Sequence, residues 1–430
     1  MPDTAQVTTL DSGVRVVTER LPGVRSVALG LWVRTGSRDE TPAQAGLSHF
    51  LEHLLFKGTD RFSSLEIDET FDAMGAEVNA GTGKETTSVY SRFLDRHLER
   101  AFDVLQDMVL RPSYPDIDSE RQVVMEEIAM YEDEPSDKVH DVLAKAIFGD
   151  HPLGRPVIGR AEVVSSVPIP DIAAYHDARY TPGRMVVSAA GSIDHDHLVR
   201  LTEAALAVGG PGGNGVVELP HETPPDATPT VGFFSKDTEQ YHLCLGAPGL
   251  SRGDDRRFAL RVLDTILGGS TSSRLFQEVR EKRGLAYAVF SYASQYVDSG
   301  QVGLYVGTRP DNVTQAMEVI GTELRRVAEE GVNEEELERA RENAKGRTTL
   351  AMESTSARMS RLGNSLLMDV PLLTLDEILA KIDSVTLDDV SELASGLFDP
   401  GRMSAAGVGA DEAVFREALA AVDPRLAEAA

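Results

Sequence analysis

A chain of 430 residues, of which 41% are hydrophobic, is long enough to bury the cores of about two to four domains. Asp and Glu outnumber Lys and Arg by 69 to 42, and the formal net charge of -27 disfavours contact with phosphate backbones, so we expect no nucleic-acid partner. The single cysteine, Cys244, excludes an internal disulfide and a cysteine-rich zinc site, so a zinc ion would need His and carboxylate ligands.

The N-terminal stretch MPDTAQVTTLDSGVRVV has neither the apolar region of a secretory signal nor the composition of an organellar transit peptide. No apolar run approaches the roughly 20 residues that a membrane-spanning helix requires. Because a single cysteine also suits a reducing compartment, these features predict a cytoplasmic protein with no membrane partner.

Two stretches have the composition of buried strands, 27–33 (VALGLWV) and 185–191 (MVVSAAG), and alternate residues from Val27 to Val33 share one face. Between them, apolar residues recur at three- and four-residue spacing. This spacing predicts helices at 46–56, 64–74, 97–110 and 118–131. Interleaved strands and helices predict an α+β fold in which helices pack on a sheet.

The second half of the chain repeats the first at an offset of 218 residues. YTPGRMVVSAAG begins at Tyr180 and FDPGRMSAAG begins at Phe398, so Pro182 and Pro400 occupy equivalent places. The same offset relates Val167 to Val385, Asp171 to Asp389, and the pair Glu120-Arg121 to Glu338-Arg339. A repeat of this length predicts two copies of one domain-sized unit.

The segment 209–230 is dense in Gly and Pro, which interrupt helices and strands, and we interpret it as the linker between the two copies. The predicted domains are therefore an N-terminal domain at 1–208 and a homologous C-terminal domain at 231–430.

The most informative motif is SHFLEHLLFKG, which begins at Ser48. On a helix, His49, Glu52 and His53 share one face. Two imidazoles one turn apart can bind a single Zn²⁺, and a carboxylate beside them can deprotonate a metal-bound water. This H-x-x-E-H spacing is the signature of the inverzincin metallopeptidases.

The alternative for this motif is a pair of half-buried histidines with satisfied hydrogen bonds and a solvated glutamate. The apolar neighbours of the motif disfavour that alternative, because they would pack the helix into a core where unpaired charge is costly. The second copy should carry the same helix near residue 267, and the sequence contains no histidine after His242. The histidines are therefore expected to serve chemistry and not the fold.

A catalytic zinc ion usually has three protein ligands and one open position. The predicted helix at 118–131 offers Glu120, Glu126 and Glu127. Glu120 and Glu127 lie two turns apart on the same side, and we predict Glu127 as the third ligand, with Glu120 orienting another ligand. Spacing alone does not separate Glu126 from Glu127.

Three stretches together, HFLEH, ERQVVMEEI and REKRGLAY, resemble the M16 metallopeptidases of the pitrilysin and insulinase group. The chain resembles in length the short two-domain subfamily that includes the mitochondrial processing peptidase and bacterial processing-protease relatives. The resemblance covers essentially the whole chain and implies that Glu127 is the third zinc ligand, with Glu120 at the start of its motif. It also implies two homologous α/β sandwich domains with mainly antiparallel sheets, and one Zn²⁺ per chain, held by the first.

The resemblance extends to substrate handling. GAEVNAGTGKETTSVY resembles an edge strand that docks the peptide, with Asn79 and Ala80 at the matching positions. An open strand edge offers unpaired N–H and C=O groups that a peptide can complete. Arg280 and Tyr287 match the arginine and tyrosine that contact the substrate and stabilise the developing oxyanion. From the residues alone, the alternative is equally well supported: Arg280 would be a surface arginine in a salt bridge, and Tyr287 would be a tyrosine of the core.

The expected function is that of a zinc-dependent endopeptidase that hydrolyses unstructured peptides or precursor segments, with Glu52 activating the zinc-bound water as general base. Single-chain relatives enclose the peptide between two such halves, so we expect a dimer. Identical subunits are expected, with Arg280 and Tyr287 serving the partner's zinc site, and a heterodimer with another M16-like chain is the other possibility. The alternative functions are a non-catalytic M16-like scaffold or regulatory subunit and a peptide-binding module without turnover.

Overall fold

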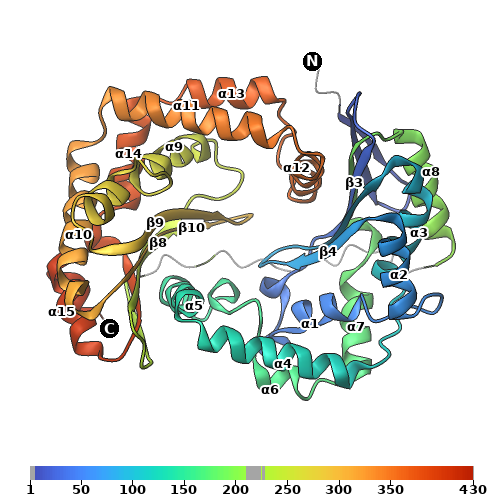
Figure 1. Ribbon diagram of the computed structural model, residues 1–430, viewed down its shortest axis with the longest axis horizontal. Helices are drawn as coiled ribbons and strands as arrows, with labels where there is room; N and C mark the ends of the chain where they lie inside the picture. Colours follow the sequence, from blue (N-terminus) through green and yellow to red (C-terminus); the bar gives the residue numbers. More distant parts are fainter. Residues whose placement is uncertain (1–4, 210–223, 225–227, 430) are drawn as a thin grey trace. The chain divides into compact units, whose positions relative to one another are not determined.

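The computed structural model describes residues 5–209, 224 and 228–429, which form two compact units (Figure 1). Unit 1 comprises the described parts of Met1–Ile128, Pro156–His221 and Thr349–Leu375. Unit 2 comprises the described parts of Ala129–Arg155, Glu222–Thr348 and Asp376–Ala430. The predicted linker at 209–230 lies largely outside the described residues.

Unit 1 is built on a six-stranded sheet in the order β1-β2-β6-β3-β5-β4. The strands are β1 (Ala5–Thr9), β2 (Arg15–Arg20), β3 (Ser26–Val33), β4 (Glu77–Thr82), β5 (Thr87–Leu94) and β6 (Met185–Gly191). Only β2 and β6 pair in parallel, and the other described pairs are antiparallel. The predicted strands at 27–33 and 185–191 are confirmed as β3 and β6.

The helices of unit 1 include those predicted from apolar spacing. They are α1 (Leu47–Leu54), α2 (Ser64–Met74), α3 (Leu98–Leu110), α4 (Ile117–Asp133), α6 (Ala161–Val164), α7 (Ile169–Arg179), α8 (His195–Ala207) and α12 (Thr355–Leu367), with α4 continuing into unit 2. Local sequence sets the ends of α2, because the Ser63 side chain and Glu66 form a capping box and Gly75 closes the helix at φ 60.

Strand β3 is buried on both faces. Val27, Leu29, Leu31 and Val33 belong to the core formed with the helices, as their alternation predicts. On the opposite face, Trp32 belongs to a second core cluster that includes residues of α12.

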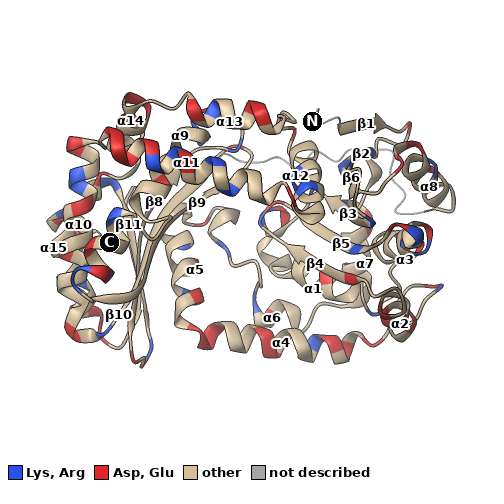
Figure 2. Cartoon of the chain, turned by 45° about the horizontal axis from the view of Figure 1, so that its top comes forward, with Lys and Arg blue, Asp and Glu red and all other residues tan. Residues whose placement is uncertain are grey.

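Unit 2 repeats this architecture. Its sheet has the order β7-β11-β8-β10-β9, and again a single pair, β7 with β11, is parallel. The strands are β7 (Val231–Ser235), β8 (Tyr241–Gly249), β9 (Ala286–Gln295), β10 (Gly300–Thr308) and β11 (Ser404–Gly409). The helices are α5 (Pro135–Phe148), α9 (Arg257–Leu267), α10 (Val313–Glu330), α11 (Glu334–Ala351), α13 (Leu375–Asp383), α14 (Leu387–Leu397), α15 (Glu412–Val422) and α16 (Pro424–Glu428). Asp and Glu recur along α4, α10 and α11 (Figure 2).

The predicted duplication is confirmed by element positions as well as by strand order. The 3-10 turns Pro182–Arg184 and Pro400–Arg402 are 218 residues apart, and so are α7 and α14. Each turn leads directly into the strand that pairs in parallel, β6 or β11. The predicted α+β class with mainly antiparallel sheets is therefore correct.

The two copies exchange one helix, which the sequence did not indicate. Helix α5 precedes the linker and packs on β7, β8 and β11 of unit 2, whereas α12 lies in the second half of the chain and packs on β2, β3 and β6 of unit 1. The compact units therefore differ from the contiguous domains expected at 1–208 and 231–430, because each sheet is covered by a helix from the other half of the sequence.

Close packing and a buried ion pair hold α12 on the sheet of unit 1. A Cβ atom at Gly363 would lie 2.2 Å from Trp32 Nε1, so only glycine allows this approach. Trp32 donates a 2.7 Å hydrogen bond to Ser188 Oγ. The buried Glu19 carboxylate on β2 pairs with Arg358 and, at 3.3 Å, with Arg361, both on α12. The exchanged helix therefore depends on charge pairing as well as apolar contact.

Among the described residues, no helix combines the length and apolar character needed to cross a membrane.

We predict that Glu19→Gln lowers the free energy of unfolding by about 3 kcal/mol, because it leaves two mostly buried guanidinium groups without their carboxylate. Asp103→Asn is the matched control, since Asp103 and its partner Arg61 are more than one third exposed, and its loss should stay below about 1 kcal/mol. Urea denaturation followed by circular dichroism measures both. Equal losses in the two variants would show that the Glu19 pair does not hold α12.

Candidate metal centre

Helix α1 presents the H-x-x-E-H motif from a firmly anchored position. Its opposite face, including Phe50, Leu51 and Leu54, is fully buried in the core. At its N-terminus, the buried Glu40 carboxylate accepts hydrogen bonds from the backbone N–H groups of Gly46 at 2.9 Å and Ser48 at 2.7 Å. A carboxylate there satisfies free N–H groups and complements the helix dipole, so the direction of α1 is fixed.

The three predicted ligands lie together in unit 1. His49, His53 and Glu127 each offer one ligand atom, and these atoms all lie within 4.8 Å of one another. The Nε2 atoms of His49 and His53 lie 3.5 Å and 3.3 Å from the two carboxylate oxygens of Glu127. Each histidine nitrogen thus faces a different oxygen of the same carboxylate, and two imidazoles with one carboxylate form a ligand set that Zn²⁺ accepts.

A buried carboxylate orients one of these ligands. Glu120, on α4, accepts a 2.8 Å hydrogen bond from His53 Nδ1, and its other oxygen pairs with Lys57 Nζ at 2.6 Å. The bond at Nδ1 keeps a hydrogen there and leaves Nε2 free to bind a metal. This is the position that the predicted role of Glu120 requires.

Glu52 lies on the same helix beside the ligands. Burial raises the pKa of its carboxyl group, and a hydrogen bond from Thr82 on β4 partly opposes that effect. Burial likewise lowers the pKa of His49, which favours the neutral imidazole that binds metals. Glu52 Oε2 is buried without a hydrogen-bond partner among the described residues, as expected of a site that takes a further group.

The structure separates the two glutamates that spacing left equivalent. Glu127 reaches both histidines, whereas the neighbouring Glu126 is exposed and is not part of the group. A helical step of 100° accounts for the difference, because only Glu127 shares the side of α4 that carries Glu120.

The predicted docking strand is the terminal strand β4. It pairs with β5, and within the described residues no strand pairs with its other edge. Asn79 and Ala80 are in its centre, and the Asn79 side chain accepts a hydrogen bond from Ala80 N. Thr82, at the end of β4, touches Glu52. The open edge therefore leads toward the histidine cluster.

Arg280 and Tyr287 lie together in unit 2. Arg280 lies in the last turn of a short π-helix, Phe276–Glu281. Its guanidinium stacks on the Tyr287 ring at 4.6 Å and donates a hydrogen bond to Tyr287 O. Tyr287 is 79% exposed, which excludes the core-tyrosine reading. Helix α9, which follows β8 as α1 follows β3, contains no histidine.

Sequence analysis missed three residues of this site. Lys57 follows His53 by four residues, a spacing that places both residues on one side of a helix. This spacing was a signal in the sequence that both could contact the same carboxylate. Glu40 and Thr82 reach α1 only through tertiary contacts, so no local pattern marks them.

Two family models match the chain. Insulinase (Peptidase family M16) matches residues 15–161, which include the histidine cluster, and Peptidase M16 inactive domain matches residues 166–344. The chain belongs to peptidase family M16. The description of the second M16 model agrees with the absence of histidines from α9.

Curated relatives are similar over most of the chain. An uncharacterized zinc protease of Streptomyces coelicolor is 46% identical over 91% of this chain and 86% of its own length. The uncharacterized zinc protease YmxG of Bacillus subtilis is 44% identical over 91% of this chain and 95% of its own length.

Solved structures show the same fold. A protease from Helicobacter pylori matches with a TM-score of 0.90 at 21% identity, covering 95% of this chain and 99% of that one. A structure described as a peptidase M16 inactive domain, from Pseudomonas fluorescens, matches with a TM-score of 0.88, also at 21% identity, over 95% and 98% of the two chains.

We predict that Glu127→Gln abolishes stoichiometric zinc binding and that Glu120→Gln weakens it about 10- to 100-fold, because Glu120 orients His53. Glu126→Gln is the matched control on the same helix and should bind zinc normally. Competition with a chromogenic chelator measures all three affinities. Weakened binding in Glu126→Gln with normal binding in Glu127→Gln would reverse the assignment.

Proposed function

We propose that this protein is a zinc-dependent endopeptidase that hydrolyses peptide bonds in unstructured peptides or precursor segments. The observation that carries the proposal is the convergence of His49, His53 and Glu127, with the half-buried Glu52 beside them at the end of an open strand edge. The names of the curated relatives support zinc and proteolysis as the general activity.

In this proposal His49, His53 and Glu127 hold one Zn²⁺, which would supply Lewis acidity and lower the pKa of a coordinated water. Glu52 acts as general base and takes a proton from the attacking water. It then returns that proton to the leaving amine, which requires a carboxyl group that is easily protonated. Burial supports this cycle, because it raises the pKa of Glu52.

The open edge of β4 would hold the substrate as an added strand, with its N–H and C=O groups paired to the backbone around Asn79 and Ala80. Recognition through backbone groups favours extended, unstructured segments over folded proteins. Arg280 and Tyr287 would contact the substrate carbonyl and stabilise negative charge on its oxygen. Their stacked, exposed pair in unit 2 supports such a role.

We further infer that the active form is a dimer of identical subunits, in which Arg280 and Tyr287 serve the zinc site of the partner subunit. A heterodimer with a second M16-like chain is the other arrangement to test. The single, fully buried Cys244 supports action in the cytoplasm.

The competing function is a non-catalytic M16-like scaffold or regulatory subunit. A scaffold has no use for a buried, unpartnered carboxylate oxygen such as Glu52 Oε2, because burying a polar atom without a partner costs stability. The complete set of ligand and base residues therefore favours the peptidase.

We predict that metal-loaded wild-type protein cuts a mixed library of unstructured peptides and that a chelator stops the cleavage. Glu52→Gln should lose at least about 10²- to 10⁴-fold in kcat while keeping its zinc, because the general base is gone and the ligands remain. Mass spectrometry of the products and metal analysis of the same samples provide both readouts. Normal activity of zinc-loaded Glu52→Gln would rule out this mechanism.

We predict that inactive Glu52→Gln and Tyr287→Phe proteins restore activity when mixed, because a mixed dimer contains one site with both residues intact. Subunit exchange must be verified by native mass spectrometry of differently tagged chains. Mixed dimers without activity would contradict the arrangement in trans but not the peptidase itself.

A further inference from the structure

Arg184 is a buried arginine without a charged partner. It ends the 3-10 turn Pro182–Arg184, directly before β6, and is 5% exposed. Within the part of the chain that the structure describes, its guanidinium makes no hydrogen bond or ion pair, and the Nη1 atom is buried. Because an arginine keeps its positive charge in a protein, burial without a partner is costly.

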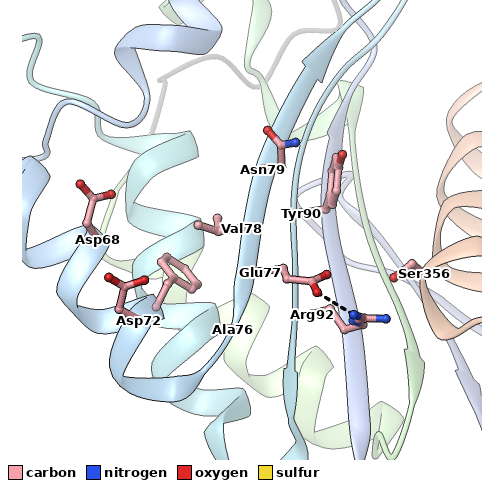
Figure 3. A pocket seen from close by; sticks show the side chains of 10 residues that line it. Asp68, Asp72, Ala76, Glu77, Val78, Asn79, Tyr90, Arg92 and Ser356 are labelled. Atoms are coloured by element: carbon pink, nitrogen blue, oxygen red, sulfur yellow. Dashed lines mark hydrogen bonds and ion pairs between the residues drawn. The ribbon is translucent and has the colours of Figure 1, made fainter.

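Other arginines of unit 1 do have carboxylate partners. Arg38 is buried and pairs with Glu85 at 2.8 Å. Even the exposed Arg92 on β5 has one, because it lies beside Glu77 in the groove next to β4 and pairs with it at 2.7 Å (Figure 3). The unpaired guanidinium of Arg184 therefore needs a specific explanation.

Further donors without partners surround Arg184. Its backbone N–H donates to Thr181 O at 2.9 Å, and the Thr181 hydroxyl is buried without a hydrogen bond to any described residue. Arg179, at the end of α7, donates from Nη2 to Asp39 O at 2.8 Å. Its Nη1 atom is buried, lacks a hydrogen bond and lies 4.0 Å from Asp39 Oδ1. The Ser37 hydroxyl, on the same turn as Asp39, is a fourth such donor.

The charges around Arg184 do not balance. Burial lowers the pKa of the Arg184 guanidinium, the Asp39 carboxylate partly opposes this effect, and the positive charges of Arg179 and Arg34 add to it. Arg34 already pairs with Asp369 at 2.9 Å. The Asp39 carboxylate then faces two mostly buried guanidinium groups, those of Arg179 and Arg184, so one positive charge is left over.

The second copy of the unit shows that the turn does not require this arrangement. At the offset of 218 residues, Arg402 corresponds to Arg184, and Asp399 corresponds to Thr181. Arg402 is exposed, and Asp399 accepts a 3.0 Å hydrogen bond from Gly401 N within its own turn. Unit 2 thus has a carboxylate where unit 1 has an unpartnered hydroxyl. The fold alone does not explain why Arg184 is buried.

We propose that Arg184, Arg179 and the Thr181 hydroxyl bind a small monovalent anion such as chloride. N–H and O–H donors that carry excess positive charge are the groups that hold such an ion, and one negative charge balances this group. Because Arg184 and Thr181 are 5% and 3% exposed, the site does not admit a bulky organic anion.

The proposed anion site adjoins the helix that carries the histidine motif. The Arg179 guanidinium lies 5.2 Å from the centre of the Tyr175 ring, and Tyr175 OH shares a 2.8 Å hydrogen bond with Ser48 Oγ. Ser48 precedes His49 at the start of α1. An anion that fixes Arg179 would therefore stabilise the N-terminal end of α1.

Thermal unfolding tests the site without depending on activity. Sodium chloride replaces sodium gluconate at constant ionic strength, because gluconate is too large for the site. In wild-type protein, each tenfold rise in chloride above its dissociation constant should raise Tm by about 2 to 4 °C. Arg184→Gln should abolish this dependence. The matched control is Arg402→Gln, at the equivalent exposed turn of unit 2, which should keep it.

A wild-type Tm that does not depend on chloride overturns the proposal. A dependence that persists in Arg184→Gln, or that is lost equally in Arg402→Gln, overturns it as well. Thr181→Asp provides a second variant, because it supplies a negative charge covalently, as Asp399 does in unit 2. Its Tm should no longer depend on chloride.

Bromide locates the ion directly in the wild-type protein. Crystals grown in sodium bromide should show an anomalous scattering peak within hydrogen-bond distance of the Arg184 and Arg179 guanidinium groups, and crystals of Thr181→Asp should lack it. A water molecule at this place, with no anomalous peak, contradicts the proposal even if Arg184→Gln fails to fold.

Discussion

The candidate metal centre depends on one buried contact, the Glu120 carboxylate that joins α4 to the segment carrying α1. Two ligand atoms come from α1 and the third from α4, so their spacing is only as fixed as the packing of these helices. Glu120 accepts from His53 Nδ1 and pairs with Lys57 in the same place. Because a buried carboxylate is costly without its partners, separating the helices would expose an unpaired charge. The same interaction of Glu120 therefore orients His53 and holds α4 against the segment that carries α1.

The duplication shows which features belong to the fold and which to the site. Apart from the additional edge strand β1 of unit 1, unit 2 has the same strand order and the same single parallel pair, and its corresponding helix, α9, contains no histidine. Its buried residues are apolar apart from Thr265. The fold therefore does not require titratable groups in this helix. In unit 1 the helix at the same location carries two histidines and a glutamate, and two of their polar atoms are buried without a hydrogen-bond partner among the described residues, which costs stability.

Sequence patterns predicted this fold wherever the deciding information was local. Apolar spacing located α1 to α4, alternation located β3, and the five-residue motif placed two histidines and a glutamate on one face. Selection of Glu127 over Glu126 from spacing was not possible, because it depends on how α4 rotates against α1. The contacts of Thr82 and Glu40 cross the tertiary structure, and so does the exchange of α5 and α12. Such contacts join segments that are far apart in the sequence, so no periodic pattern of residues predicts them.

The helix exchange also constrains how the protein is made. The face of the first sheet around Trp32 and Val186 is covered by α12, which leaves the ribosome only after most of the second sheet has been synthesised. Every nascent chain therefore carries an uncovered apolar sheet face for much of translation, and such faces favour misassembly. A chain that terminates before α12 keeps that face exposed permanently. Each sheet is therefore closed only after segments from both halves of the sequence have been synthesised.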